Sequence, residues 1–123
     1  MARTFIGNQE QTKEILKKAI QHNGYALVDI FQPCVSFNKI NTFQWFKDNT
    51  YALPEDHDPT DRQAAFRWAC QEAADGKLPL GVFYVNPNKK PYHEMINTYK
   101  HDSRPLWQRP VDQEALKALV GTF

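Results

Sequence analysis

Residues 24–38 read Gly-Tyr-Ala-Leu-Val-Asp-Ile-Phe-Gln-Pro-Cys-Val-Ser-Phe-Asn, and this stretch decides the fold. Residues 25–31 are nearly continuously apolar and lack alternation, which is typical of a buried parallel strand. Pro33 cannot donate a hydrogen bond to a sheet and therefore ends the strand. The pattern predicts that Cys34 lies just beyond the carboxyl end of that strand, where open α/β sheets place ligands and cofactors.

An amphipathic helix is predicted before this strand, over residues 9–22. Asn8 is a suitable N-cap, and Asn23-Gly24 supplies a left-handed stop. Four apolar residues recur at the spacing of one helix face. They are Ile15, Leu16, Ala19 and Ile20.

Two shorter elements are predicted after the strand. Residues 42–47 are rich in aromatic side chains and read as one or two helical turns capped by Asn41. Residues 80–85 form a second apolar run and are predicted to be a second buried strand.

Residues 58–75 predict a helix between these elements, with Asp58 or Thr60 as its N-cap. The start of this helix is acidic, since residues 55–58 are Glu-Asp-His-Asp and Asp61 follows. Carboxylates and imidazole suit a divalent cation, but the ligand spacing of an EF-hand is missing. We favour the interpretation that these acids cap the helix and interact with its dipole.

The last part of the chain, residues 86–123, is rich in prolines and turns and is predicted to be an extended tail. It ends in a short helix with Asp112 as N-cap. Residues 1–85 form the α/β part of the chain. Two strong strands make too small a sheet to bury two helical layers, so we expect this part to belong to a larger body.

The composition excludes several classes of protein. The chain has 123 residues, 15 basic and 14 acidic, so its net charge of +1 argues against nucleic acid or an anionic membrane as a partner. No apolar run approaches the roughly 20 residues of a membrane span, and no apolar leader is evident, so we expect a cytoplasmic location. The five glycines form no phosphate-binding loop.

The chain has two cysteines, Cys34 and Cys70, which form no CxxC pair. Neither a disulfide framework nor a self-contained zinc site is therefore encoded. Cys70 lies beside Ala69 in the predicted helix and is expected to be a small buried thiol. Cys34 suits either a nucleophile or a metal ligand, and the backbone of residues 35–38 offers hydrogen bonds to an anion or to cluster sulfur.

Residues 24–38 resemble a strand and loop of the β subunit of 2-oxoacid:ferredoxin oxidoreductases. Similar sequences there read Gly, an aromatic residue, an apolar run, and then Pro-Cys-Val-Ser/Thr-Phe-Asn. Residues 41–47, 57–65 and 78–84 resemble later landmarks of the same subunit, in the same order. The resemblance covers about residues 3–92 and concerns the C-terminal portion of the subunit.

This resemblance implies a fold and an activity. The fold would be the terminal part of a thiamine-diphosphate-binding parallel α/β domain, followed by the extended tail. The family couples oxidative decarboxylation of a 2-oxo acid, with coenzyme A, to reduction of ferredoxin. It uses thiamine diphosphate, Mg²⁺ and a [4Fe–4S] cluster, and Cys34 matches the fourth cluster cysteine.

The resemblance also implies partners. They are the N-terminal part of the β subunit, which carries the other three cluster cysteines, the α subunit and ferredoxin. The diphosphate-binding Gly-Asp-Gly motif of the family is absent from this chain. The 123 residues alone are therefore expected to bind neither thiamine diphosphate nor a complete cluster, and to be inactive.

Two other interpretations remain open from the residues alone. In the first, the chain is a non-enzymatic α/β interaction module in which residues 43–46 and the proline-rich tail form a partner-binding face. In the second, Cys34 is a peroxidatic thiol. The second is weaker because the sequence shows neither a resolving cysteine nor a cationic helix start nearby. The sequence does not identify the 2-oxo acid.

Overall fold

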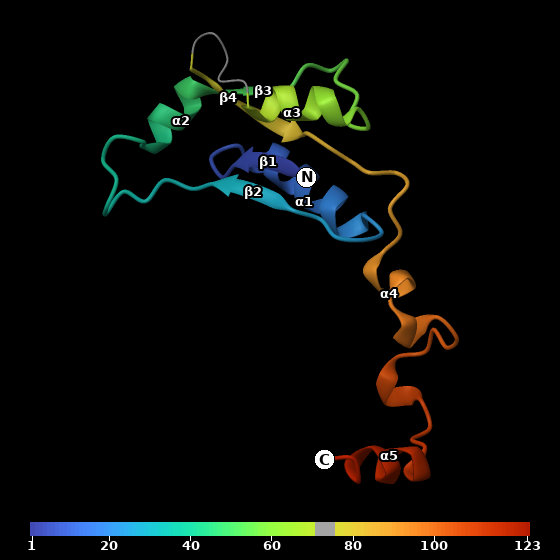
Figure 1. Cartoon of the computed structure of the whole chain (residues 1–123). Coiled ribbons are helices and arrows are strands. Elements are labelled where there is room, and N and C mark those ends of the chain that lie inside the picture. The colour runs from blue at the N-terminus through green and yellow to red at the C-terminus, as the bar shows by residue number, and fades with distance from the viewer. Residues whose placement is uncertain (71–75) are drawn as a thin grey trace. The chain divides into compact units, whose positions relative to one another are not determined.

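The computed structural model describes residues 1–70 and 76–123, and the chain divides into two compact units, Met1–Lys90 and Pro91–Phe123. The first unit contains a β-sheet with helices, and the second contains short helices and turns (Figure 1). No helix in the described residues has the length and apolarity needed to cross a bilayer.

The first unit is built on a four-stranded sheet with strand order β2-β1-β4-β3 (Figure 1). Strand β1 pairs in parallel with β2 and antiparallel with β4, and β3 pairs in parallel with β4. The sheet is therefore mixed, and the prediction of a parallel sheet is wrong for β4. An apolar run shows that a strand is buried but not in which direction it runs. The strands are β1 (Ala2–Phe5), β2 (Val28–Phe31), β3 (Thr50–Ala52) and β4 (Leu78–Val82).

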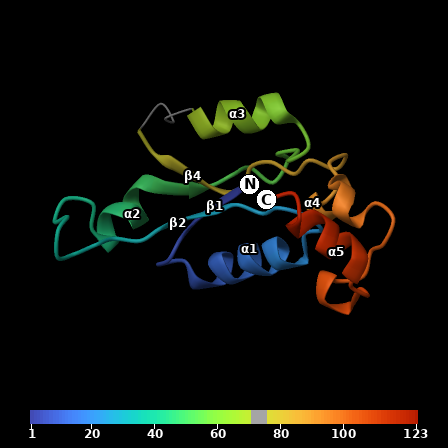
Figure 2. The same ribbon diagram turned by 60° about the horizontal axis from the view of Figure 1, so that its bottom comes forward.

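Helices α1 (Gln9–Gln21) and α3 (Arg62–Cys70) lie on opposite faces of the sheet (Figure 2). The predicted N-cap of α1 is confirmed, because the side chain of Asn8 accepts a hydrogen bond from the Gln11 amide. The apolar face is confirmed only in part, since Ile15 is buried whereas Ile20 is 83% exposed. The first unit thus has a helix, a sheet and a second helix as its three layers.

A buried polar contact joins α1 to β1. The hydroxyl of Thr12 donates to the Phe5 carbonyl at 3.1 Å, and its oxygen lies 2.8 Å from the Thr4 hydroxyl. Both threonines are buried, so these hydrogen bonds satisfy groups that water does not reach. They fix the helix on the sheet together with the buried side chain of Ile15.

Helix α3 begins later than predicted. The carboxylate of Asp61 accepts from the amides of Gln63 and Ala64 and is the N-cap. Asp58 instead accepts from the amide and the hydroxyl of Thr60 in a turn before the helix, so neither predicted cap is correct. Residues 71–75, over which the helix was predicted to continue, lie outside the described residues.

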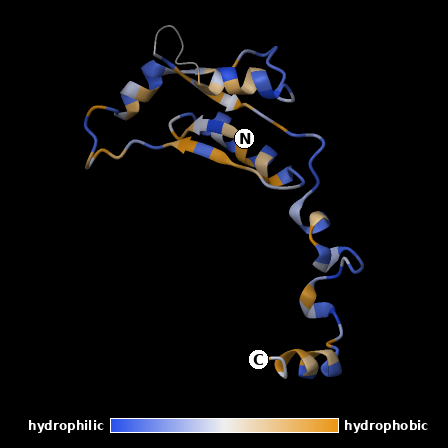
Figure 3. Cartoon of the chain, in the orientation of Figure 1, coloured by the Kyte–Doolittle hydropathy of each residue, from blue (hydrophilic) through white to orange (hydrophobic). Residues whose placement is uncertain are grey.

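Strand β2 is at the edge of the sheet, and the prediction that it is buried is wrong. Its side chains are half-buried or exposed, with Ile30 38% exposed, although the strand is largely apolar (Figure 3). The second predicted strand, over residues 80–85, is found two residues earlier as β4 (Leu78–Val82), and its burial is confirmed, since Leu80 is only 4% exposed. Strands β1 and β3 were not predicted, because runs of four and three residues are too short to show periodicity.

Helix α2 (Phe43–Asn49) is held at the ends of β1 and β2 by aromatic packing. The ring of Phe46 lies 5.4 Å from that of Phe5 and 5.1 Å from that of Phe31, between ring centroids. The N-cap is Thr42, which accepts from the Trp45 amide, and not Asn41 as predicted. The contact of Phe46 with Phe31 therefore holds the start of α2 near the end of β2, and so fixes both ends of the loop that joins them.

A half-buried ion pair joins β1 to the edge strand. The Arg3 Nε donates to the Asp29 carboxylate at 2.8 Å, and these two residues are direct partners in the β1–β2 register. The Arg3 guanidinium also lies over the rings of Phe31 and Phe83, at 5.1 Å and 5.5 Å from their centroids. The pair therefore adds cation–π contacts to a charge-assisted hydrogen bond.

The second unit, Pro91–Phe123, contains four short helical elements joined by turns. The predicted final helix is confirmed, with the Asp112 side chain accepting from the Ala115 amide. The other three elements were not predicted, because proline-rich sequence hides such short turns. The elements are α4 (Tyr92–Met95), the 3₁₀ helices η1 (Asn97–Tyr99) and η2 (Leu106–Gln108), and α5 (Gln113–Val120).

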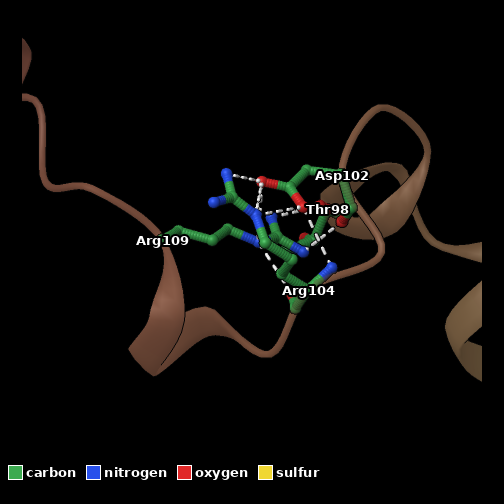
Figure 4. Close-up of polar contacts among 4 residues, drawn as sticks. All are labelled: Thr98, Asp102, Arg104 and Arg109. Carbon is green, nitrogen blue, oxygen red and sulfur yellow. Dashed lines mark hydrogen bonds and ion pairs between the residues drawn. The ribbon is translucent and has the colours of Figure 1, made fainter.

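One arginine organises the turns of the second unit (Figure 4). The guanidinium of Arg109 donates to the carbonyl oxygens of Thr98, Asp102 and Arg104, at 2.6 Å, 2.5 Å and 3.0 Å. The carboxylate of Asp102 accepts from the guanidinium and the backbone amide of Arg104. We call residues 98–109 the Arg109 loop.

The aromatic packing of α2 yields a first prediction. Replacing Phe46→Ala removes a ring that contacts two strands, so we expect the free energy of unfolding to fall by about 2 kcal/mol. Phe43→Ala is the matched control, because Phe43 is 44% exposed and should cost less than about 1 kcal/mol. Urea denaturation measures both. Equal losses would show that Phe46 is not the anchor of the helix.

The Asp102 carboxylate yields a prediction about pH. Hydrogen bonds from Arg104 lower the pKa of Asp102 from 3.8 to about 2. The ionised group therefore stabilises the Arg109 loop above pH 3.8, and this contribution is lost as the pH falls toward 2. Two-dimensional NMR should show the resonances of residues 98–109 shifting over this range. In Asp102→Asn this shift should be absent, and its persistence would contradict the assignment.

Candidate functional site

Cys34 lies in the loop between β2 and α2, as predicted from the sequence. Strand β2 ends at Phe31, and the buried residue Pro33 directly precedes the cysteine. The Cys34 thiol is free and the residue is exposed. The strand, the proline and the aromatic packing of α2 thus hold a loop that presents one accessible sulfur.

Hydrogen bonds within the loop fix its path. The amides of Phe37 and Asn38 donate to the Cys34 carbonyl, at 3.2 Å and 2.8 Å. The Asn38 side-chain oxygen accepts from the amides of Ile40 and Asn41, both at 3.0 Å. The amides of Phe37 and Asn38 are thus engaged within the loop, whereas the sequence suggested the backbone of residues 35–38 as a donor to an anion or to cluster sulfur. The residue patterns had not pointed to the Asn38 side chain as an organiser of the loop.

Three apolar side chains of the Cys34 loop are exposed. Val35 is 61% exposed, Phe37 93% and Ile40 80%. Three large apolar side chains within one short loop are unusual on a surface that only water contacts. A protein surface that covered the loop would place the thiol in an apolar environment.

Cys70 is exposed at the end of α3, and the prediction of a buried thiol is wrong. The buried residue of that helix is Ala65. Cys70 follows it by five residues, a spacing that places the two side chains on different faces of a helix. Both cysteines are free, and they belong to different elements.

The acidic stretch before α3 is organised as a turn and a helix cap. Within residues 1–70 and 76–123, no group of three His, Cys, Asp or Glu side chains is arranged to hold a metal ion. Asp58 and Asp61 act in the turn and the cap, and the His57 Nε2 lies 2.9 Å from the Phe83 carbonyl. The interpretation that these acids cap the helix is confirmed for Asp61, whereas Asp58 stabilises the turn that precedes it.

A cavity lies elsewhere on the first unit. An apolar cavity of about 640 Å³ is bordered by the C-terminal half of α1, by Met1 and Ala2, and by residues 25–28 where β2 begins. Its lining includes the basic side chains of Lys18 and Lys89 and the imidazole of His22. Because Cys34 follows the opposite end of β2, the cavity and the cysteine loop are separate features.

The aromatic segment 43–46 is not a free partner-binding face. The ring of Phe46 packs on β1 and β2, and Trp45 packs edge-on against Phe46 at 5.0 Å between centroids. Phe43, which is 44% exposed, is more open but also contacts the ring of Phe5. The interaction-module interpretation therefore loses the aromatic part of its proposed surface, whereas the proline-rich tail still exposes apolar side chains such as Trp107.

A soft thiolate is the ligand type that iron–sulfur clusters require. Within the described residues Cys34 belongs to no group of three potential metal ligands, and Cys70 lies in another element, so this chain fits such a cluster as the source of one thiolate. Any cluster bound here must therefore take its other ligands from elsewhere.

Comparison with known proteins identifies the family. The family described as the C-terminal part of the pyruvate ferredoxin oxidoreductase beta subunit matches residues 34–101, so the match begins at Cys34. The chain belongs to this family. The resemblance found in the sequence motifs is thus confirmed.

Curated relatives in the family are named as β subunits. The chain is 36% identical to 2-oxoacid:ferredoxin oxidoreductase 1, subunit beta, of Aeropyrum pernix, over 98% of the chain and 42% of that protein. It is 33% identical to the corresponding β subunit of Saccharolobus solfataricus, over 81% of the chain and 33% of that protein. The chain thus spans less than half the length of these relatives.

A solved structure has the same fold. A chain of the 2-oxoglutarate:ferredoxin oxidoreductase from Magnetococcus marinus, solved with 2-oxoglutarate, coenzyme A and succinyl-CoA bound, superposes with a TM-score of 0.74 at 30% identity. The match covers 96% of the present chain and 39% of that chain. The mixed sheet and its helices are therefore a fold of this family.

The loop geometry yields a prediction for Asn38. In Asn38→Ala the amides of Ile40 and Asn41 lose their acceptor, so we expect their hydrogen exchange to be about tenfold faster, with little change in global stability. Asn86→Ala removes a similar acceptor from another exposed turn and should leave these two amides unchanged. Unchanged exchange in Asn38→Ala would show that the loop is held by other contacts.

Proposed function

We propose that this chain is part of the β subunit of a 2-oxoacid:ferredoxin oxidoreductase. Such an enzyme couples oxidative decarboxylation of a 2-oxo acid, with coenzyme A, to the reduction of ferredoxin. The observation that carries the proposal is the match of 96% of the chain to a solved enzyme of this kind, at a TM-score of 0.74. Family membership and the β-subunit relatives support it.

Within such an enzyme, Cys34 would be one ligand of a [4Fe–4S] cluster. A bound cluster takes up and passes on single electrons. The chain supplies the Cys34 thiolate on a loop fixed by Pro33 and Asn38, and the same loop carries exposed apolar side chains. Apolar surroundings exclude water and thereby tune the potential of a metal centre.

The first unit would belong to the thiamine-diphosphate-binding domain of the enzyme. Thiamine diphosphate and Mg²⁺ would be held by the part of the subunit that carries the Gly-Asp-Gly motif, which this chain lacks. The α subunit, ferredoxin, the 2-oxo acid and coenzyme A would be its partners and substrates. The cytoplasmic location and the inactivity of the 123 residues alone stay predictions from the sequence.

The role of Cys34 is tested by its removal from the full-length protein assembled with its partner subunits. Cys34→Ala should lower the iron content and abolish or distort the electron paramagnetic resonance signal of the reduced cluster. Cys70→Ala is the matched control, because it removes an exposed thiol from another element and should leave the signal intact. An unchanged signal and iron content in Cys34→Ala would contradict the assignment.

A further inference from the structure

Arg3 contacts the edge strand β2 at two positions. Its Nε donates to the Asp29 carboxylate at 2.8 Å, and its guanidinium lies 5.1 Å from the centroid of the Phe31 ring. Arg3 and Asp29 are direct partners in the register, and Phe31 is on the same face of the sheet because side chains alternate along a strand. One side chain of the central strand thus holds two successive side chains of the edge strand.

The surroundings of Arg3 make the contact with Asp29 costly to lose. The Arg3 side chain is 20% exposed, and on its other side the guanidinium lies 5.5 Å from the centroid of the Phe83 ring, which is buried. Without the Asp29 carboxylate, the Nε of a charged group between two rings would lose its acceptor. The structure therefore favours the arrangement of β2 that keeps Asp29 opposite Arg3.

An edge strand needs a contact of this kind to fix its register. Strand β2 pairs with β1 at the edge of the sheet, and its side chains are half-buried or exposed, so burial specifies its register weakly. A slip of one residue would turn Asp29 to the opposite face of the sheet, away from Arg3. Fixing the register of paired elements is the best-attested role of partly buried ion pairs, whose net contribution to stability is small.

The register of β2 determines where the Cys34 sulfur lies. The loop to α2 leaves β2 at Phe31, and Cys34 follows three residues later (Figure 1). A slip of one residue moves a strand by about 3.3 Å, whereas distances between a metal and its ligands must lie within about 0.2 Å of their usual values. Phe31 also contacts Phe46 of α2, at the far end of the loop. A side chain that holds Phe31 therefore acts on the whole loop.

We propose that Arg3 is a positioning residue for the cluster ligand Cys34. By binding Asp29 and packing against Phe31, it fixes the register of β2 and the point at which the sulfur meets the iron. This inference rests on the proposed function, in which Cys34 binds a [4Fe–4S] cluster. Because Arg3 and Asp29 neutralise each other, their effect on the cluster is one of position and not of charge.

The test uses the full-length protein assembled with its partner subunits. Arg3→Met removes the hydrogen bond and the guanidinium but keeps a long side chain. It should change the electron paramagnetic resonance g values of the reduced cluster and speed iron release to a chelator by at least about tenfold, as expected when a group that orients a metal ligand is lost. Asp29→Ala removes the same hydrogen bond at a position that is 42% exposed, and it should have both effects even if Arg3→Met fails to assemble.

Two further variants separate position from charge. Asp29→Asn removes the negative charge but keeps a side-chain oxygen that can accept from Arg3, so its g values and iron release should stay close to those of the wild type. Lys17→Met is the matched control, because it removes an ion pair with Glu14 that lies entirely on α1. It should change iron release by less than about twofold.

A second readout needs no cluster. In the cluster-free full-length protein, Arg3→Met should speed hydrogen exchange of the Ile6 amide, which donates to the Phe31 carbonyl at the end of β2, and of the Asn38 amide within the loop. Exchange at the wild-type rate would show that Arg3 does not hold β2 in place.

The outcomes separate this inference from the proposed function. If Cys34→Ala leaves the cluster signal intact, the proposed function is contradicted. If Cys34→Ala abolishes the signal but Arg3→Met and Asp29→Ala leave the g values and iron release unchanged, the positioning role is overturned while the proposed function stands. An effect of Asp29→Asn as large as that of Asp29→Ala would also overturn it, because charge would then be the cause. Equally fast iron release in Lys17→Met would overturn it as well, since the effect would not be specific to β2.

Discussion

The packing of Phe46 against Phe5 and Phe31 is the contact on which the rest of the site depends. It joins α2 to the ends of the central strand and the edge strand, and so fixes both ends of the loop that contains Cys34. Aromatic pairs at such distances contribute packing energy and a preferred orientation. The position of the sulfur is therefore set by the core of the first unit, even though the sulfur itself is exposed.

The site has the properties of one component of a larger assembly. One thiolate cannot hold an iron–sulfur cluster, and its loop carries three exposed apolar side chains. Strand β2, which directly precedes this loop, is an edge strand with half-exposed side chains. These features are consistent with a family whose curated members are more than twice as long as this chain. The family relationship and the exposed surfaces thus support the same interpretation.

The sequence predicted the elements with strong local signals. The Asn8 cap, the position of Cys34 after a strand and the final helix at Asp112 are set by residues close in the chain. Features that depend on distant contacts were missed. Strand β1 is too short to show a pattern, and the direction of β4 depends on its pairing with that strand.

The errors in burial have the same origin. An apolar run such as residues 25–31 does not show whether a strand is central or at an edge, because this depends on its neighbours in the sheet. Cys70 was expected to be buried because it lies beside Ala69, but the buried residue of α3 is Ala65. The Arg109 loop was not predicted because its hydrogen bonds join a side chain to carbonyls up to 11 residues away.

The most direct test of the account is the location of iron in crystals of the assembled, full-length protein, by anomalous diffraction at the iron edge. The account predicts an anomalous peak within bonding distance of the Cys34 sulfur, with α2 packed on β1 and β2. Iron bound elsewhere, with the Cys34 thiol free and in contact only with solvent, would contradict it.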